Sequence, residues 1–368
     1  MKVLHINSNY LYTTLFDKMV QHLNLLGVNN TVFMPTSGKI NFVIPPKEFV
    51  HHPVSFNKKD SYFFYLKQAK IFKSLKLNLD VTKFDLVHAH TLFTDGCIAY
   101  KLKKKYGLRY IVAVRNTDVN TFFKYMVHMR GLGIKILKEA EKIIFLSESY
   151  KKLVLEKYVP RKIKAEISYK SEVIPNGIDE FWFKNKGDNK DLVNKYSLNL
   201  VYAGTINKNK NIINTIKSID ILEEEGYSVI FTVVGRIVDD SIYQQILSKP
   251  YVKYITQKAK EDLIDIYRKN DIFVMPSKTE TFGLVYAEAM SQGLPIVYTK
   301  NQGFDGQFKE GKVGFHVEWN DPREIADRII DISRKYKELS INSIELNGKF
   351  NWIEISQKYK VLYKLSAE

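Results

Sequence analysis

The sequence lacks cysteine almost entirely, and it lacks any long apolar run. Its one cysteine, Cys97, excludes both a disulfide framework and a thiolate metal site within a single chain, and favours a reducing compartment. No stretch approaches the roughly 18 consecutive apolar residues that a membrane-spanning helix needs. Met1 and Lys2 lead directly into an apolar run that we expect to form a first core strand, not a signal sequence. We therefore expect a cytoplasmic protein, soluble or peripheral on the inner face of the cell membrane.

The net positive charge of the chain arises in its first half. Residues 1–174 hold 29 Lys and Arg against 13 Asp and Glu, whereas residues 175–368 hold 27 of each. Scattered solubilising charge would not divide in this way, although a Lys- and Asn-rich composition inflates basic counts in some proteins. The asymmetry favours an anionic partner for the first half, and lipid headgroups, a phosphate-bearing acceptor and nucleic acid all fit.

Short apolar runs alternate with helical patterns along the whole chain. Continuously apolar strands that are separated by helices are typical of parallel sheets with both faces covered. Right-handed crossovers then predict two doubly wound, Rossmann-like domains with ligands at the carboxyl ends of the strands. The predicted strands are Lys2–Asn7, Thr31–Pro35, Asp85–His90, Tyr110–Val114, Lys142–Ser147, Leu198–Ala203, Val229–Gly235, Val252–Thr256, Asp271–Pro276 and Pro295–Tyr298.

Turn-forming residues place the domain boundary near residues 173–179, where Pro175 and Asn176-Gly177 occur. We expect an N-terminal, acceptor-binding domain over 1–174 and a C-terminal, nucleotide-sugar-binding domain over 175–350. The last segment, 351–368, has aromatic and aliphatic residues at three- and four-residue spacing and is predicted to be an amphipathic helix.

The densest functional signal is the segment 276–295, PSKTETFGLVYAEAMSQGLP. A buried strand ends at Pro276, Gly283 permits close backbone approach, and a helix follows whose free amides would attract an anion. Glu280 and Glu288 would then flank a phosphate-sized positive pole. Taken singly, each glutamate is better explained without a ligand, Glu280 as a charge at a helix N-terminus and Glu288 as a solvated helix residue.

The whole segment resembles the donor-binding region of the GT-B, family 4 (retaining) glycosyltransferases of bacterial surface-polysaccharide biosynthesis. The hallmark of that family is two glutamates separated by seven residues, and Glu280 and Glu288 fit it. Further similarity covers 174–179, 202–210, 271–277 and the final helix, which resembles the family's helix that crosses back to the first domain. The resemblance implies the GT-B fold, in which the two domains face each other across a cleft.

The resemblance also implies roles for individual residues of the second half. Glu280 would contact the donor sugar, Glu288 would bind the ribose, and Lys210 would bind the phosphates as negative charge develops on the leaving group. Lys210 also reads simply as a solvated residue of an Asn/Lys-rich loop. The loop amides would hold the sugar and diphosphate, and these belong to Thr281, Phe282, Gly283 and Leu284.

Two departures from the family pattern bear on phosphate binding. The family usually has an arginine after the glycine of its phosphate loop, but here Thr205 follows Gly204. Arg236, which follows a glycine at the end of another predicted strand, is a possible substitute. The first strand leads into Asn7-Ser8-Asn9-Tyr10 instead of a glycine-rich loop, so Asn9 is a candidate for lining the cleft through its side chain.

In the first half, Arg115, Asn116 and Asp118 follow a predicted strand. Many family members have histidine where Arg115 stands; a guanidinium cannot act as a base, so we expect Arg115 to clamp a phosphate. Asp118 would orient an acceptor hydroxyl or cap a helix that begins near Asn120. For His88 and His90 we expect one side chain in the core and the other in the cleft, with His90 assigned to the acceptor side.

The resemblance implies front-face substitution without a protein nucleophile. We expect no metal requirement and no cofactor, since the nucleotide-sugar is a substrate, and UDP is mildly preferred to GDP. The acceptor would be a lipid-linked or anionic glycan. A nucleotide-sugar epimerase or hydrolase of the same fold, or a basic nucleic-acid-binding protein, are the alternatives; the leading reading has no nucleic-acid partner.

Two stretches of the first half interleave aromatic residues with cations and a third is a plain basic run, a combination suited to an anionic membrane surface. Core-facing aromatics with solvated lysines would give the same pattern. The stretches are 58–76, 101–105 and 122–130.

Overall fold

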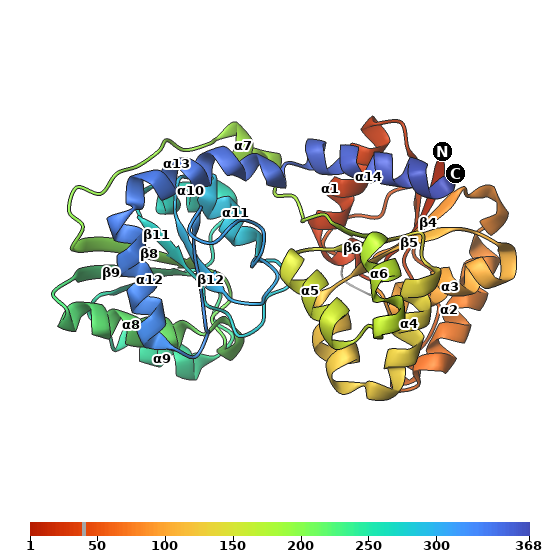
Figure 1. Cartoon of the computed structure of the whole chain (residues 1–368), viewed down its shortest axis with the longest axis horizontal. Helices are drawn as coiled ribbons and strands as arrows, with labels where there is room; N and C mark the ends of the chain where they lie inside the picture. The colour runs from red at the N-terminus through yellow and green to blue at the C-terminus, as the bar shows by residue number, and fades with distance from the viewer. Residues whose placement is uncertain (39–41) are drawn as a thin grey trace. The chain divides into compact units, whose positions relative to one another are not determined.

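The computed structural model describes residues 1–38 and 42–368, and their contacts divide the chain into two units (Figure 1). Unit 1 comprises Met1–Gly177 and Trp352–Glu368, and unit 2 comprises Ile178–Asn351. Each unit is an α/β domain built on a parallel sheet, which confirms the predicted fold class. None of the helices formed by the described residues combines the length and apolarity that crossing a bilayer requires.

Unit 1 contains a seven-stranded sheet in which each observed pairing is parallel. From edge to edge the strands are β3 (Val50–His51), β2 (Asn29–Phe33), β1 (Lys2–Ile6), β4 (Leu86–Ala89), β5 (Tyr110–Val114), β6 (Lys142–Phe145) and β7 (Ser171–Val173). The helices are α1 (Thr14–Leu25), α2 (Phe64–Asn78), α3 (Thr94–Tyr106), α4 (Arg130–Glu139), α5 (Glu148–Lys157), α6 (Arg161–Tyr169) and α14 (Trp352–Ala367), with short turns η1 (Tyr10–Tyr12), η2 (Lys58–Tyr62), η3 (Val81–Lys83), η4 (Asp118–Phe123) and η5 (Val127–Met129).

Both faces of the unit 1 sheet are buried, and successive side chains of a strand serve opposite faces. In β1, Leu4 and Ile6 join the core beneath α2, α3 and α4, whereas Val3 joins the core beneath α1 and α14. The final helix contributes Trp352, Ile355, Tyr359 and Tyr363 to that second core, all nearly inaccessible to solvent. Burying this aromatic stripe explains why α14 packs on unit 1.

Unit 2 contains a six-stranded parallel sheet. Its strands, in spatial order, are β10 (Val252–Ile255), β9 (Ser228–Val234), β8 (Ser197–Ala203), β11 (Ile272–Val274), β12 (Ile296–Thr299) and β13 (Gly314–Val317). The helices are α7 (Glu180–Lys184), α8 (Ile212–Glu224), α9 (Asp240–Leu247), α10 (Lys260–Arg268), α11 (Leu284–Met290), α12 (Pro322–Arg334) and α13 (Tyr336–Leu346), with turns η6 (Lys208–Lys210) and η7 (Asn347–Phe350).

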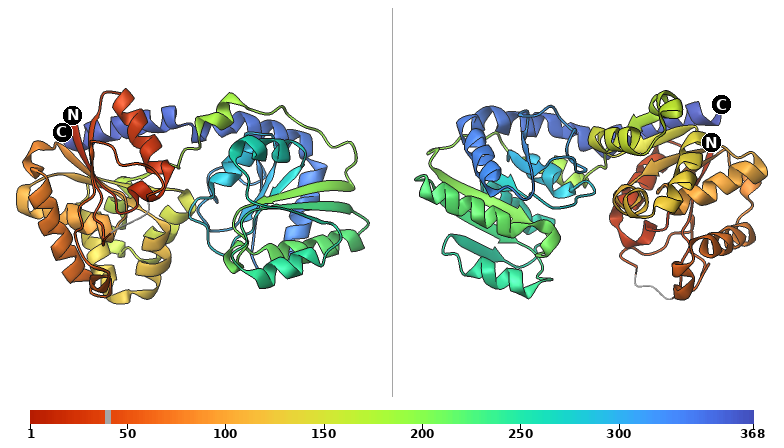
Figure 2. Two further views of the ribbon diagram at one scale, coloured as in Figure 1. Left: turned by 180° about the vertical axis from the view of Figure 1, so that it is seen from behind. Right: turned by 60° about the horizontal axis from the view of Figure 1, so that its bottom comes forward.

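Helices α8, α9 and α12 of unit 2 lie next to one another on one side of its sheet (Figure 2). Local chemistry sets the start of α12: the side chain of Asp321 accepts a hydrogen bond from the Glu324 amide, and Pro322 occupies the first helical position. The carboxyl ends of β8, β9 and β11 are left to carry loops.

Candidate functional site

The loops after β8 and β11 of unit 2 are bound to each other by side chains. Asn207 accepts hydrogen bonds from the amides of Asn209 and Lys210 and so shapes the short turn η6. Asn209 in turn bonds Thr279 through the threonine hydroxyl at 2.6 Å and through the Thr279 carbonyl at 2.8 Å. These contacts hold Lys210 against the loop that carries Glu280.

Lys210 and Glu280 form an ion pair, with 2.6 Å between Nζ and Oε2. Their side chains are only 19% and 13% exposed, which strengthens the attraction over that of a surface pair. The other carboxylate oxygen, Oε1, accepts a bond from the Thr281 amide at 3.1 Å, and the Glu280 amide donates to Gln302. The structure thus brings together the two residues that the sequence placed at the reacting centre.

A pocket of about 200 Å³ lies beside this pair, at the ends of β8 and β9. Gly204 and Gly235 face each other there, and a Cβ at position 235 would fall 1.7 Å from the Gly204 carbonyl oxygen. A Cβ at position 204 would lie 3.9 Å from Cε of Lys210, so the lysine lies next to Gly204, although it does not itself line the pocket. Val285 and Leu263 add apolar walls. A pocket with apolar walls and a lysine close by suits a nucleoside phosphate.

Thr205 and Arg236 line the same pocket. The Arg236 side chain is exposed, and its carbonyl accepts a hydrogen bond from the Ile206 amide at 2.9 Å. Arg236 therefore brings a cation to the pocket that Thr205 also lines, and Thr205 occupies the position where the family has an arginine. Gln257 and Lys258, which the sequence analysis missed, complete the rim from the loop after β10.

Replacing Arg236 by alanine is expected to raise the KM for a nucleotide-sugar about 10-fold and to change kcat less, because a charge-assisted bond to phosphate contributes about 1.5–3 kcal/mol. Steady-state kinetics over a range of donor concentrations measures both constants. Lys253→Ala, an exposed cation of β10 outside the pocket, is the matched control. An unchanged KM in Arg236→Ala would remove this residue from donor binding.

The helix after the loop, α11, has seven residues and begins after Gly283, whose φ of +75° lies in the left-handed region. Of the loop residues, Thr281 is exposed, whereas the ring of Phe282 is buried against Phe304 and Phe350. Phe282 can therefore offer a ligand only its backbone. Because α11 has only seven residues, its N-terminus offers an anion less than the charge of Lys210 does.

Glu288 lies one turn beyond Val285 on α11 and is partly buried. It interacts with the Trp182 side chain, Asp179 and Lys260, and burial raises its pKa to about 7. It does not line the pocket of about 200 Å³ that holds Val285. Its contact with a ribose therefore remains a prediction.

Unit 1 has its own pocket, of about 330 Å³, where the segments after β1, β2, β4 and β5 meet. Asn9 and Asp118, two of the five residues predicted for this unit, line it. Six of its side chains carry a hydroxyl on an aliphatic carbon: Ser8, Thr36, Ser37, Thr91, Thr94 and Thr117. Hydroxyl-lined walls of this kind suit a sugar or a phosphate.

Asp118 is almost completely buried, and its carboxylate accepts three backbone bonds: from Leu92 at 2.9 Å, Phe93 at 3.1 Å and Arg115 at 2.9 Å. None of these amides belongs to the helix near Asn120, so the predicted capping role is wrong. Burial raises the pKa of Asp118 to about 6. The carboxylate joins the loops after β4 and β5, and so positions the wall of the pocket.

Arg115 points into unit 1, with its guanidinium 3.2 Å from the His90 carbonyl oxygen and 3.3 Å from Asn176 Oδ1. Asn116 accepts a bond from the Asn120 side chain at 2.7 Å. Neither residue lines the pocket of about 330 Å³. A phosphate-clamping role for Arg115 stays a prediction. In this structure the guanidinium donates hydrogen bonds to buried groups of unit 1.

The expectation that His88 and His90 point in opposite directions is wrong. Residues two apart on a strand share a face, and both rings are buried on the side covered by α14, stacked at 4.0 Å. His5, opposite His88 in β1, joins them: its Nδ1 lies 3.0 Å from His90 Nε2, and its Nε2 lies 2.8 Å from Asn30 Oδ1. His88 Nδ1 is 2.7 Å from the Tyr363 hydroxyl. His90 is thus part of the core.

Burial lowers the pKa of His5 to about 4, and burial followed by neighbouring charges lowers the pKa of His88 and His90 well below the usual value. Stability that depends on neutral histidines is complete above about pH 6.5 and is lost as the pH falls toward the folded-state pKa. Each such group adds up to about 1.4 kcal/mol per pH unit. Asp95 and Asp118 affect the free energy of unfolding in the opposite direction over this range: burial raises the pKa of each, so their contribution to stability increases as the pH falls.

Replacing His88 by phenylalanine is therefore expected to make unit 1 less sensitive to acid, by up to about 1.4 kcal/mol per pH unit between pH 6.5 and 5. Hydrogen exchange of β1 and β4 amides at a series of pH values gives the local opening free energy. His128→Gln, at an exposed position of the same unit, should keep the wild-type slope. An unaltered slope in His88→Phe would contradict the neutral-histidine account.

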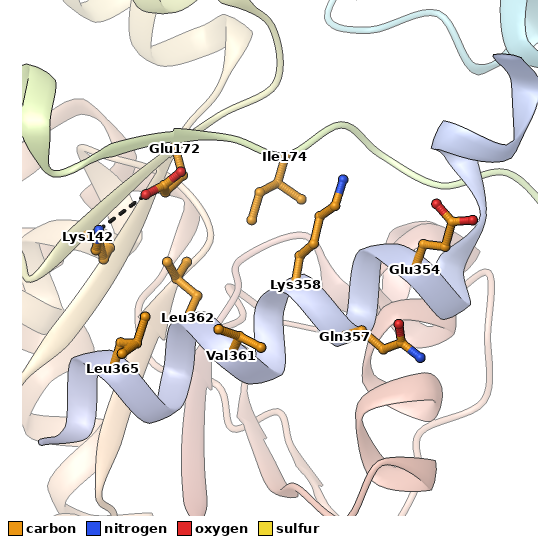
Figure 3. A pocket seen from close by; sticks show the side chains of 9 residues that line it. All are labelled: Lys142, Glu172, Ile174, Glu354, Gln357, Lys358, Val361, Leu362 and Leu365. Carbon is orange, nitrogen blue, oxygen red and sulfur yellow. Dashed lines mark hydrogen bonds and ion pairs between the residues drawn. The ribbon is translucent and has the colours of Figure 1, made fainter.

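A larger hollow of unit 1, about 510 Å³, lies between the ends of β6 and β7 and helix α14 (Figure 3). Val361, Leu362 and Leu365 give it apolar walls, and a Lys142–Glu172 ion pair of 3.2 Å lies at its border. None of the predicted site residues lines this hollow, and its two facing charges, Lys142 and Glu172, neutralise each other.

Two groups of possible metal ligands occur among the described residues: His5, His88 and His90 in unit 1, and Asp305, Glu310 and His316 in unit 2. Neither group contains Glu280, Glu288 or Asp118.

Family profiles match both halves of the chain. Residues 13–180 match Glycosyltransferase Family 4, and residues 172–344 match Glycosyl transferases group 1. The protein is a GT-B glycosyltransferase. The group 1 profile contains Lys210, Glu280 and Glu288, so the residues predicted for the donor site lie within the matched segment.

The glycosyltransferase is similar along most of its length to proteins of the same class. An uncharacterized glycosyltransferase of Methanocaldococcus jannaschii is 24% identical over 86% of this chain and 85% of its own. CapM of Staphylococcus aureus, a capsular polysaccharide biosynthesis glycosyltransferase, is 32% identical over 60% of this chain and 59% of its own.

Solved structures confirm the fold of the transferase. Sucrose-phosphate synthase from Thermosynechococcus elongatus superimposes with a TM-score of 0.75 at 16% identity, covering 99% of this chain and 98% of that one. HepE of Anabaena, crystallised with UDP and glucose, gives a TM-score of 0.68 at 15% identity and covers 99% of each chain.

Proposed function

We propose that this glycosyltransferase moves a hexose-type sugar, with retention, from a nucleotide-sugar to a lipid-linked or anionic glycan acceptor in cell-surface polysaccharide synthesis. The observation that carries the proposal is the Lys210–Glu280 pair, 2.6 Å apart, beside the pocket lined by Gly204 and Gly235. A cation, a carboxylate and an apolar slot are the parts that a nucleoside diphosphate with an attached sugar requires.

In the proposed complex, the nucleoside occupies the glycine-lined pocket and the diphosphate lies at Lys210 and Arg236. Glu280 faces the sugar. Before the donor binds, Glu280 neutralises Lys210; the arriving diphosphate takes over the lysine and frees the carboxylate for sugar hydroxyls. Because Asn207 fixes the turn that carries Lys210 beforehand, the backbone around the lysine needs little reorganisation during the reaction.

In the proposed reaction, the bond between the anomeric carbon and the phosphate oxygen breaks, and its electron pair goes to the diphosphate. The acceptor oxygen bonds to the same face of the anomeric carbon, and its proton passes to an oxygen of the leaving diphosphate. Lys210 and Arg236 stabilise the developing negative charge, and Glu280 stabilises positive charge on the sugar. The lysine and arginine supply the positive charge that a divalent ion would, so we propose that no metal is needed.

Two comparisons support the choice of substrates. HepE, with the same fold, was crystallised with UDP and glucose, which agrees with a preference for UDP-sugars. CapM acts in capsular polysaccharide biosynthesis, which agrees with an acceptor on the way to the cell surface.

We also propose that unit 1 binds anionic membranes. Tyr62, Phe63 and Tyr65, at the start of α2, are 87%, 65% and 62% exposed. A contact between Phe64 and Phe122, with ring centroids 6.0 Å apart, brings this segment next to the chain leading to Tyr125, which is 70% exposed. Exposed aromatics with lysines among them are typical of interfacial surfaces.

Replacing Lys58 and Lys59 together by glutamine is expected to weaken binding to phosphatidylglycerol vesicles about 10- to 30-fold, at roughly 1 kcal/mol per cation. Vesicle pelleting at low salt measures the affinity. Lys217 and Lys253, exposed cations of unit 2, provide the matched control when replaced together. Equal binding to phosphatidylglycerol and phosphatidylcholine would dispose of the membrane proposal.

The function is tested with a panel of UDP-, GDP- and ADP-sugars, followed by nucleoside diphosphate release with and without a membrane extract as the source of acceptor. The proposal predicts release that depends on the extract and retains the anomeric configuration in the product. Rapid release without any acceptor would indicate a hydrolase, and an isomerised sugar would indicate an epimerase. Release from no member of the panel would refute the proposal.

A further inference from the structure

The pocket of about 330 Å³ in unit 1 holds one cation, Lys67, among the residues that line it. Lys67 belongs to α2 and is partly buried, and its Nζ lies 4.4 Å from the centre of the Phe56 ring, which also lines the pocket. Within residues 1–38 and 42–368, no carboxylate is within ion-pair distance of this ammonium group. A partly desolvated charge without a counterion is costly to the folded protein.

The carboxylate that acts on Lys67 from a distance is Asp95, which does not neutralise it. Asp95 is completely buried and is engaged by Ser8, whose hydroxyl donates to Oδ1 at 2.6 Å. Burial raises the pKa of Asp95 to about 7, so the carboxyl is only partly ionised at neutral pH. Desolvation correspondingly lowers the pKa of Lys67. Asp118, the carboxylate that lines the pocket, accepts three backbone bonds, so neither acid forms an ion pair with Lys67.

Hydroxyl-bearing side chains line the pocket around Lys67. Thr36 and Ser37 follow β2, Thr91 and Thr94 follow β4, and Ser8 follows β1, so hydroxyl groups approach the pocket from three strand ends. Hydroxyls donate to phosphate oxygens, and an ammonium bound to the same phosphate makes the stronger, charge-assisted bond. A neutral sugar would satisfy the hydroxyls but would leave Lys67 without a counterion.

We infer that Lys67 determines acceptor specificity by binding a phosphate group that the acceptor carries. This inference rests on the proposed function, since it treats the pocket of unit 1 as the place of the acceptor. The phosphate can come from a soluble sugar phosphate or from a lipid headgroup, because both present the same oxygens. Lys67 then supplies the charge, and the lining hydroxyls of Ser37 and Thr117 orient the group; those of Ser8 and Thr36 already donate within the protein, to Asp95 and to the Pro53 carbonyl.

The test is pulse labelling of lysine amines on the whole wild-type chain, read by mass spectrometry at Lys67 and at Lys73. Lys73 is an exposed residue of the same helix and serves as the internal control. Glucose 6-phosphate near saturation is expected to slow labelling of Lys67 at least about five-fold and to leave Lys73 unchanged, whereas glucose protects neither. Vesicles with phosphatidic acid, compared with phosphatidylcholine alone, form the second arm.

Protection by glucose 6-phosphate identifies a soluble phosphate as the ligand, and protection only by phosphatidic acid identifies a headgroup; both support the inference. Labelling of Lys67 that neither phosphate slows, or that glucose slows equally, overturns it. Calorimetric titration of Lys67→Gln with the protecting phosphate should then show at least about a ten-fold weaker Kd than Lys73→Gln. Because labelling needs no donor, its failure leaves donor turnover intact, and absent turnover leaves labelling unaffected.

Discussion

Lys210→Ala is expected to lower kcat/KM for the nucleotide-sugar about 100- to 1000-fold, because it removes a preorganised positive group where negative charge develops. The residue is held 2.6 Å from Glu280 by a turn that Asn207 and Asn209 fix, so its position does not depend on the ligand. Nucleoside diphosphate binding should weaken in the same variant. Initial rates of nucleoside diphosphate release and calorimetry provide the two measurements.

Glu280→Gln separates the two halves of the ion pair. We expect turnover to fall by a similar factor, about 100-fold or more, because the carboxylate no longer stabilises positive charge on the sugar. Binding of the nucleoside diphosphate alone should hold or tighten, since Lys210 loses its competing anion. Lys208→Ala, an exposed cation of the same turn, is the control. Wild-type turnover in either site variant would remove that residue from the mechanism.

Asp118→Ala is expected to lower the free energy of unfolding of unit 1 by about 3–5 kcal/mol. The carboxylate satisfies three backbone amides, from Leu92, Phe93 and Arg115, and each buried amide left without a partner costs about 1–3 kcal/mol. Asp118→Asn retains one accepting oxygen and should cost less. Urea unfolding followed by hydrogen exchange in β4 and β5 measures the loss.

The same variants test whether Asp118 acts as a general base or only holds the wall of the pocket in place. If it positions the pocket wall, Asp118→Asn that remains folded should keep turnover within about ten-fold of wild type. A general base would lose about 100- to 10,000-fold at unchanged stability, and that result would contradict a positioning role. Thr117→Ala, on the adjacent exposed residue of the same pocket, should change stability by less than about 0.5 kcal/mol.

The sequence was most informative where chemistry is local. The strand Tyr110–Val114 has the predicted bounds because all five residues are apolar and buried on both faces. The loop with Glu280 and the helix after Gly283 also occur where turn chemistry placed them. By contrast, β3 and β7 have two and three residues and are too short to show any period, so they were missed.

What depends on distant neighbours could not be predicted. Lys258 lines the pocket of about 200 Å³ in unit 2 only because β10 pairs with β9 at the end of the sheet. Lys67 was expected on a solvated, membrane-facing helix, and only the packing of α2 reveals it beside Phe56 in a pocket. For His88 and His90, by contrast, the two-residue period of a strand already places both side chains on one face, as the stacked rings show.

The most direct test of the account is a crystal structure of the whole chain with bound UDP. We expect the base in the pocket of unit 2 that Gly204, Gly235 and Val285 line, and the phosphates within hydrogen-bond distance of Lys210 and Arg236, with the Lys210–Glu280 contact lengthened or broken. UDP found in the pocket of unit 1, or bound to unit 2 away from Lys210 with the ion pair intact, would contradict the proposed donor site.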